Sequence, residues 1–210
     1  MKRILIALAV LLSVQVADAQ TKTPDAAKKA VESAVAASKD AKKGAKLATW
    51  TKLATAYMDA YSAPQGAAWL GASKQELQIL MGNQKPTSVE NVIVSGEQLV
   101  KEVYADKEFY FNGNGQLVLI NITKPVVEDA LAKAADAFAK AATVDPKGTK
   151  TKDIKEGLAN IARKYIDEGM NLYQLGDLAK ASDLFEQAAE VSATAPLFIF
   201  CIACSIFLLS

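Results

Sequence analysis

The chain has 210 residues, enough for one domain or a short array of repeats, and its 24 Lys and Arg against 23 Asp and Glu leave a net charge of +1. This balance excludes the basic stripe of a nucleic-acid-binding protein and gives no attraction to an anionic membrane. Histidine is absent, which excludes Ser-His-Asp and Cys-His nucleophiles and removes the commonest metal ligand, so we expect no metal and no cofactor.

The first 19 residues predict a signal peptide. Lys2 and Arg3 give a basic start, residues 4–14 are apolar, and Ala17 and Ala19 provide the small-residue pattern of a signal peptidase site. The apolar run is shorter than the roughly 20 residues that a permanent membrane helix needs. We therefore expect an exported protein of the periplasm or cell envelope whose mature chain has no stable transmembrane span.

Residues 20–82 predict a helical hairpin region. Thr23 is a good N-cap residue and is followed by proline, which suits the first helical position. Gly44 marks a turn, and a second amphipathic helix continues to Tyr61. A short further helix ends at Gly82, since glycine is the preferred residue just beyond a helix.

Residues 83–124 predict an antiparallel β-meander. The segment is rich in Val, Ile, Tyr and Phe, and its Ser-Gly and Asn-Gly pairs are typical of hairpin turns. One such turn, residues 113–117, has glycines like those of a phosphate loop, but it leads into a strand and lacks the third glycine of that motif. We expect a helix to cover one side of the sheet. The predicted strands cover residues 89–94, 98–104, 108–111 and 116–122.

Residues 125–196 predict a second helical region. Val127, Leu131 and Ala134 begin an apolar stripe that continues to Ala141. A polar connector over residues 147–152 separates this helix from a longer one, and a third helix runs to Pro196.

One pattern of small and large residues occurs twice in these helices. Ala134, Phe138 and Ala141 place an aromatic ring between two small side chains on one helix face, as do Ala181, Phe185 and Ala188. Small residues let a neighbouring helix approach closely while the ring fills the space between helices. Matching first-helix residues are Tyr165, Gly169 and Leu172, and in the N-terminal region Trp50, Leu53, Ala54 and Tyr57.

These residues resemble the tetratricopeptide repeat, whose first helix carries W-x2-L-G-x2-Y and whose second carries A-x3-F-x2-A. Residues 162–196 resemble a nearly whole repeat, residues 126–146 a second helix and residues 47–61 a first helix. The chain departs from the family where Tyr165 replaces the Trp and Glu168 replaces the Leu. Phe138 and Phe185 are 47 positions apart, against a regular period of about 34 residues.

The predicted fold is therefore α+β and mainly α: irregular helical hairpins of an α-solenoid with a small antiparallel β-meander inserted. The order of a signal peptide, helices, a meander and repeat helices is similar to that of exported tetratricopeptide proteins of Bacteroidetes-type bacteria.

The resemblance implies a non-enzymatic scaffold that binds a protein or peptide. Its groove-facing positions lie on first helices, here Arg163, Ile166, Met170 and Tyr173, and more weakly Thr51, Thr55 and Met58. Packing between helices is the alternative for Met170 and Tyr173. The residues expected in the core of the repeats are Trp50, Leu53, Ala54, Tyr57, Ala134, Phe138, Ala141, Tyr165, Gly169, Leu172, Ala181, Phe185 and Ala188.

Two other functions stay open. The chain could be a structural subunit of an envelope assembly that docks through the edge of the meander, or an enzyme with an unfamiliar carboxylate or Lys site. The carboxylate pairs Glu128-Asp129 and Asp167-Glu168 argue little for an enzyme, because adjacent residues on a helix point about 100° apart. We interpret both pairs as charges on solvated faces and at helix starts.

Residues 197–210 differ in character from the rest of the chain. They are almost wholly apolar and contain both cysteines, Cys201 and Cys204, without the helix and strand context of a redox motif. A buried terminal helix and a membrane-associated segment are two interpretations. We favour a third, a truncated or frame-disrupted end, because a repeat array needs a polar capping helix.

Overall fold

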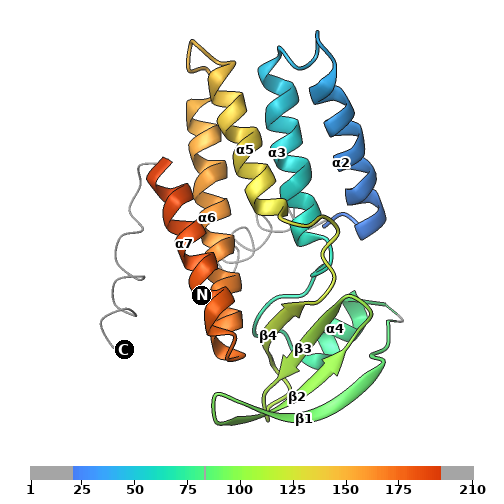
Figure 1. Cartoon of the computed structure of the whole chain (residues 1–210). Coiled ribbons are helices and arrows are strands. Elements are labelled where there is room, and N and C mark those ends of the chain that lie inside the picture. The colour runs from blue at the N-terminus through green and yellow to red at the C-terminus, as the bar shows by residue number, and fades with distance from the viewer. Residues whose placement is uncertain (1–20, 83, 195–210) are drawn as a thin grey trace, which may run out of the picture.

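A computed structural model describes residues 21–82 and 84–194 (Figure 1). These residues form six helices and one four-stranded antiparallel sheet, which confirms the predicted α+β class. No helix among them has the length and apolarity needed to cross a membrane. Ala17 and Ala19 of the predicted cleavage site and the tail 197–210 lie outside the described residues.

Five of the helices stand side by side, and neighbours in this array run in opposite directions (Figure 1). Each helix packs against the next one in the series. The array consists of α2 (Pro24–Lys39), α3 (Leu47–Ser62), α5 (Ala130–Thr143), α6 (Thr151–Gln174) and α7 (Leu178–Thr194).

The first helix of the array begins where the sequence predicts. The Thr23 side chain accepts a hydrogen bond of 3.3 Å from the backbone N–H of Ala26, and Pro24 occupies the first helical position. Ala27 and Val31 are buried, so the face of α2 that meets the array consists of small side chains.

Helices α3 and α5 pack against each other although residues 63–129 separate them. Leu53 and Ala54 of α3 share one hydrophobic core with Ala134 and Ala141 of α5. The intervening residues form a compact unit at one end of the helices (Figure 1). We call this unit, residues 63–129, the β module.

Two predicted helix starts are wrong. Helix α5 begins at Ala130, because Asp129 has a φ of +52°, in the left-handed region that interrupts a right-handed helix. Val127 was placed on the helical stripe but precedes the helix, although it still packs against the helical core. Helix α6 begins at Thr151, inside the predicted polar connector.

The sheet of the β module follows the predicted strands to within about one residue. Its strands pair in sequence order, each antiparallel to the next. The turn between the last two strands is the expected hairpin turn, in which the Asn112 Oδ1 accepts hydrogen bonds of 3.0 Å from the backbone N–H groups of Asn114 and Gln116. The strands are β1 (Ser88–Val94), β2 (Glu97–Val103), β3 (Lys107–Phe111) and β4 (Leu117–Ile122).

A short helix, α4 (Lys74–Leu80), covers one face of the sheet, as expected. Its Leu77 packs against Phe109 and Phe111 of β3. The opposite face carries a smaller cluster that packs against Leu175, from the turn after α6. The sheet is therefore covered by α4 on one side and touched by the helical array on the other.

Polar contacts hold the sheet to the segment that follows α3 and to the end of α6. The buried Lys107 Nζ donates a hydrogen bond of 2.7 Å to the backbone carbonyl of Pro64, just after α3. The Asn171 side-chain amide of α6 donates one of 3.1 Å to the carbonyl of Ile120 in β4. These bonds fix the sheet against the array and so define the space between them.

Candidate functional site

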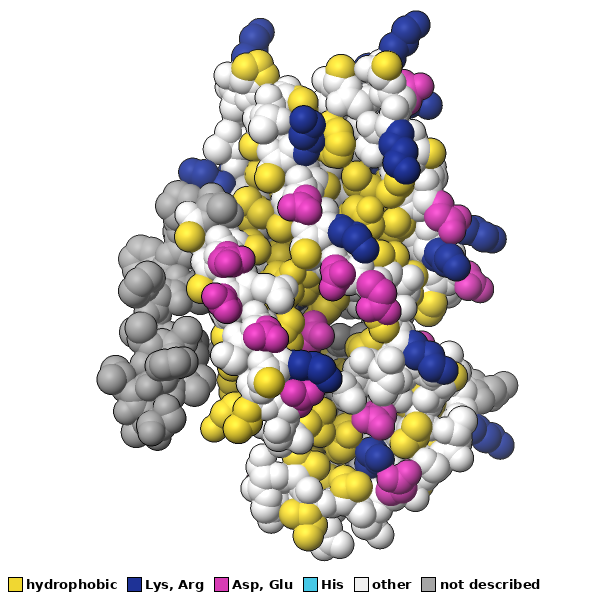
Figure 2. Space-filling view, viewed as in Figure 1, with side chains coloured by type: hydrophobic (Ala, Val, Ile, Leu, Met, Phe, Trp, Pro, Cys, Tyr) yellow, Lys and Arg dark blue, Asp and Glu magenta, His cyan; other side chains and the backbone are white. Residues whose placement is uncertain are grey.

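A cleft of about 610 Å³ lies where the β module meets the helices (Figure 2). We call it the junction cleft. The end of α3, strand β4, the segment before α5 and the second half of α6 contribute most of its surface. Its lining includes Tyr61, Gln65, Val118, Ile120, Ile122, Val127, Leu131, Met170, Leu172 and Leu184.

The charged side chains that line the junction cleft are all acidic. Glu128 and Asp129 come from the segment before α5, and Asp167 and Glu168 come from α6. No Lys or Arg of the described residues belongs to the lining. Figure 2 shows acidic side chains gathered around the hollow between the helices and the sheet. The cleft therefore favours a positively charged ligand.

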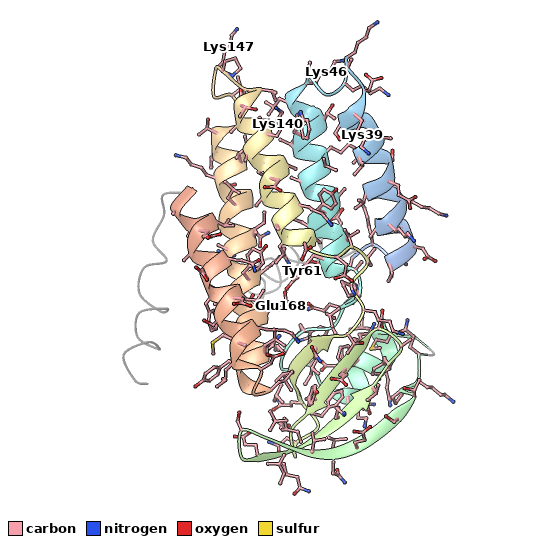
Figure 3. The ribbon with its side chains drawn as sticks, in the orientation of Figure 1. Lys39, Lys46, Tyr61, Lys140, Lys147 and Glu168 are labelled. Carbon is pink, nitrogen blue, oxygen red and sulfur yellow. The ribbon has the colours of Figure 1, made fainter. Side chains whose placement is uncertain are left out.

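Several lysines lie at the other end of the array instead. Lys39, Lys46, Lys140 and Lys147 are far from the cleft, near the turns between α2 and α3 and between α5 and α6 (Figure 3). The near-zero net charge therefore does not reveal that the charged side chains lining the cleft are all acidic.

The walls of the junction cleft combine apolar and polar side chains in similar measure. Met170 and Leu172 of α6 face this space together with Leu131 of α5. Trp69 and Leu70, at the margin, are 46% and 55% exposed. Large apolar side chains next to carboxylates suit a ligand that carries both apolar and cationic groups.

The second half of α6 contributes a half-buried carboxylate that contacts α3. The Tyr61 hydroxyl donates a hydrogen bond of 3.0 Å to Glu168 Oε2, and the two side chains point toward each other across the cleft floor (Figure 3). Burial raises the pKa of the Glu168 carboxyl above its usual range, while the bond from Tyr61 opposes this shift. Burial, and then the charge of Glu168, raise the pKa of the Tyr61 hydroxyl.

Lys164 lies behind this pair, one helical turn before Glu168. Its Nζ donates a hydrogen bond of 3.1 Å to Ser62 Oγ and sits 5.2 Å from the centre of the Tyr61 ring. Burial lowers the pKa of the Lys164 ammonium, and the charge of Asp167 opposes this. Lys164 supports Tyr61 but does not line the cleft.

The interpretation of Asp167-Glu168 as a solvated pair is wrong for Glu168. The signal that marks this residue was present in the sequence, because Glu168 occupies the position where the tetratricopeptide pattern has a buried Leu. Its partner Tyr61 lies 107 positions away, so no local pattern could identify the contact. The described residues contain no group of three or more His, Cys, Asp or Glu side chains placed to hold a metal ion.

The predicted binding residues on α6 do not share one surface in the structure. Met170 lines the junction cleft, whereas Ile166 packs against the helical core. Arg163 and Tyr173 are exposed on α6 and do not belong to the lining.

The side chains of the weaker candidates on α3 interact with their own helix or with the helical core. The Thr51 and Thr55 hydroxyls donate hydrogen bonds to backbone carbonyls one turn earlier. Met58 packs against the helical core. The structure therefore does not bring these three residues together with Met170 in one site.

The predicted core residues differ in how deeply they are buried. Phe138 is 7% exposed and Phe185 is half-buried. Each ring lies against a glycine of α6, Phe138 against Gly157 and Phe185 against Gly169, where a Cβ atom would clash with the ring. The other buried members are Leu53, Ala54, Ala134, Ala141, Tyr165, Gly169, Ala181 and Ala188, and the other half-buried ones are Trp50, Tyr57 and Leu172.

Comparison with protein-family models, with curated proteins and with solved structures found no match for this chain.

Proposed function

We propose that this chain is a non-enzymatic scaffold that binds a segment of another protein in the junction cleft. The observation that carries the proposal is a cleft of about 610 Å³ that has apolar side chains in its walls and a charged lining that is wholly acidic. The complementary ligand is a peptide segment with apolar side chains and at least one Lys or Arg. Such a segment buries its apolar part while its cation stays close to the carboxylates.

We further propose that four of the five helices of the array form two irregular hairpins of the tetratricopeptide type, with α2 packed against the first hairpin. Helices α3 and α5 form the first hairpin and α6 and α7 the second, with the β module inserted between the two helices of the first. The pairing of α3 with α5 supports this, because residues 47–61 resemble a first helix and residues 126–146 a second. The contacts of Phe138 and Phe185 with glycines of α6 support it as well.

The predicted signal peptide supports export, and we place the scaffold in the bacterial cell envelope. There the cleft would hold a segment of an envelope protein. A role as a structural subunit that docks through the meander is the second candidate, and the exposed edge of the sheet favours it.

An enzyme is the third candidate, favoured by the cluster of Tyr61, Glu168 and Lys164. The geometry of the cluster argues for a structural role. The Lys164 Nζ already donates to Ser62 and lies outside the cleft lining, and the one hydrogen bond of Glu168 comes from Tyr61. A nucleophile or general base needs its reactive atom within reach of a bound substrate.

Peptide selection and point variants test the proposed binding. A displayed library of random peptides is selected on the protein, and a selected Lys-containing peptide is compared with its Lys-to-Glu counterpart by fluorescence anisotropy. We expect the Lys peptide to bind at least about tenfold more tightly. Asp129→Asn with Asp167→Asn should weaken it several-fold, whereas Glu32→Gln, on the exposed surface of α2, should not.

Equal affinity of the Lys and Glu peptides would contradict the proposal. So would an Asp129→Asn and Asp167→Asn variant that binds as tightly as the unaltered protein. Turnover of a substrate that is lost on Glu168→Gln would favour the enzyme instead.

A further inference from the structure

The free edge of the sheet is formed by β1, whose end approaches α6 where the Ser95 hydroxyl donates a hydrogen bond of 3.0 Å to the Gln174 carbonyl (Figure 1). Two of its apolar side chains are among the most exposed in the described structure: Val89 is 56% and Ile93 is 78% exposed. An edge strand usually carries Lys, Pro or a mid-strand irregularity that prevents pairing with another chain. Residues 88–94 have no Lys and no Pro, and β1 pairs with β2 in unbroken register.

The hairpin turn determines which backbone groups face outward. Ser95 and Gly96, with φ of +52° and +84°, form a two-residue turn, and such a turn is flanked by a hydrogen-bonded pair, here Val94 and Glu97. Alternate residues of β1 therefore direct their N–H and C=O groups toward β2. The groups of Val89, Asn91 and Ile93 point away from the sheet, and no described residue forms a backbone hydrogen bond with them.

From this edge we infer that β1 pairs with β1 of a second copy of the chain, antiparallel and centred on Asn91. In this register Asn91 faces Asn91 of the other copy, and Val89 of each copy faces Ile93 of the other. All three outward-facing residues then form hydrogen-bonded pairs. The two sheets become one continuous sheet.

Side-chain chemistry makes β1 complementary to itself in this register. Val89 and Ile93 lie on one face of the strand, so each copy covers the exposed apolar side chain of the other. The Glu90 side chain lies on the other face of the strand, where it faces Val92 of the second copy. It also carries its own counter-ion, because its carboxylate lies 2.8 Å from the Lys101 ammonium of β2. Two copies therefore do not bring unpaired like charges together.

This inference does not depend on the proposed function, because β1 and the junction cleft lie at opposite edges of the sheet. Strand β4 lines the cleft, and two strands separate it from β1. Pairing through β1 leaves both clefts open, and loss of pairing leaves each cleft intact.

Sedimentation velocity of the full chain over a range of concentrations tests the pairing. We expect a dimer whose dissociation constant rises at least about tenfold in Ile93→Lys, since two Lys side chains replace two apolar contacts. Asn91→Pro should have a similar effect, because it removes an outward-facing N–H and leaves the bonds to β2. Ile79→Lys on α4 is the matched control, because Ile79 is 75% exposed and should leave the dimer unchanged.

Cross-linking tests the register. In a Cys201→Ser, Cys204→Ser background, Asn91→Cys places two thiols opposite each other, at a Cα separation of about 5.5 Å that a disulfide accepts. Val89→Cys is the control, since its two copies would lie roughly 13 Å apart along the strands. We expect mild oxidation to cross-link Asn91→Cys far faster than Val89→Cys.

A monomer at all concentrations would overturn the inference and leave β1 free for an extended peptide. Association that Ile93→Lys and Ile79→Lys leave equally strong would overturn it too, because a surface other than β1 would then hold the copies together. Equal cross-linking of the two Cys variants would overturn the register.

Discussion

Helix α6 receives a phenylalanine from each neighbour, and the two contacts differ in burial. Phe138 of α5 lies on Gly157, near the start of α6, and Phe185 of α7 lies on Gly169, near its end. The sequence pattern around both rings is the same. Phe138 is nevertheless 7% exposed, whereas Phe185 is half-buried. The pattern thus predicts that a ring meets a small residue, but not how much the contact stabilises the fold.

The position of each ring in the array explains the difference. Helix α5 lies between α3 and α6, so Phe138 is enclosed by the shared helical core. Helix α7 is the last described helix and packs mainly against α6, and part of the Phe185 ring remains open. The ring on the first half of α6 is therefore the more enclosed one, and the second half borders the junction cleft.

The largest effect should come from removing the rings. Phe138→Ala should lower the free energy of unfolding by about 3–4 kcal/mol, because it leaves a cavity in the core. Phe185→Ala should lower it by about 1–2 kcal/mol, since the half-buried ring has less contact to lose. Urea denaturation of the two variants measures the difference. Equal losses would show that the two halves of α6 are equally packed.

Replacing the glycines with alanine should have the next largest effect and should also distinguish the two halves of α6. Gly157→Ala should lower the free energy of unfolding by about 2 kcal/mol, because the new methyl group collides with the enclosed Phe138 ring. Gly169→Ala should change it by less than about 1 kcal/mol, because the Phe185 ring can turn outward and alanine favours helix. Urea denaturation measures both, and Phe138→Leu should rescue Gly157→Ala. A loss at Gly169 as large as at Gly157 would contradict this.

The contact between Tyr61 and Glu168 should matter less than the rings. Tyr61→Phe removes the hydrogen bond of 3.0 Å to a half-buried carboxylate and should lower the free energy of unfolding by about 1 kcal/mol. A double-mutant cycle with Glu168→Ala, which removes the acceptor, isolates this bond by urea denaturation. Additive effects of the two substitutions would show that the bond contributes nothing.

The smallest expected effect is an increase in the free energy of unfolding, and it should depend on pH. Burial raises the pKa of Glu168 in the folded state above its ordinary 4.5, so the folded protein favours the protonated carboxyl. Glu168→Gln should therefore raise the free energy of unfolding near pH 7, by less than about 1 kcal/mol since the site is partly open to water.

The gain should disappear as the pH falls to about 4, where both folded and unfolded states are protonated. Urea denaturation at the two pH values, with Glu32→Gln as the exposed control, measures it. A gain of equal size at both values would mean that ionisation of Glu168 costs the fold nothing.

Local patterns predicted most of the fold. Alternating Val, Ile and aromatic residues with Ser-Gly and Asn-Gly turns predicted all four strands, since each hairpin depends on neighbouring residues. The cap at Thr23 predicted the start of α2. The start of α5 was predicted too early, because apolar residues before Asp129 continue a helical pattern that the backbone at Asp129 interrupts.

The candidate site could not be predicted in the same way. The junction cleft depends on α3 packing against α5 across an insertion, and on bonds such as Lys107 to Pro64 that join distant segments. Met170 was identified from the family resemblance. The bond between Tyr61 and Glu168 was missed, because it joins α3 to α6 across 107 positions of the sequence, and Glu128 was not assigned to a cleft.

The β module leaves the array after α3 and returns at α5, at adjoining ends of two helices that pack on each other. An insertion with closely spaced ends can change in length at little entropic cost, since closure entropy grows only with the logarithm of loop length. Evolution or design can therefore exchange the whole meander for another small fold at this position. Such a graft would keep the five-helix support and give the protein a different recognition surface.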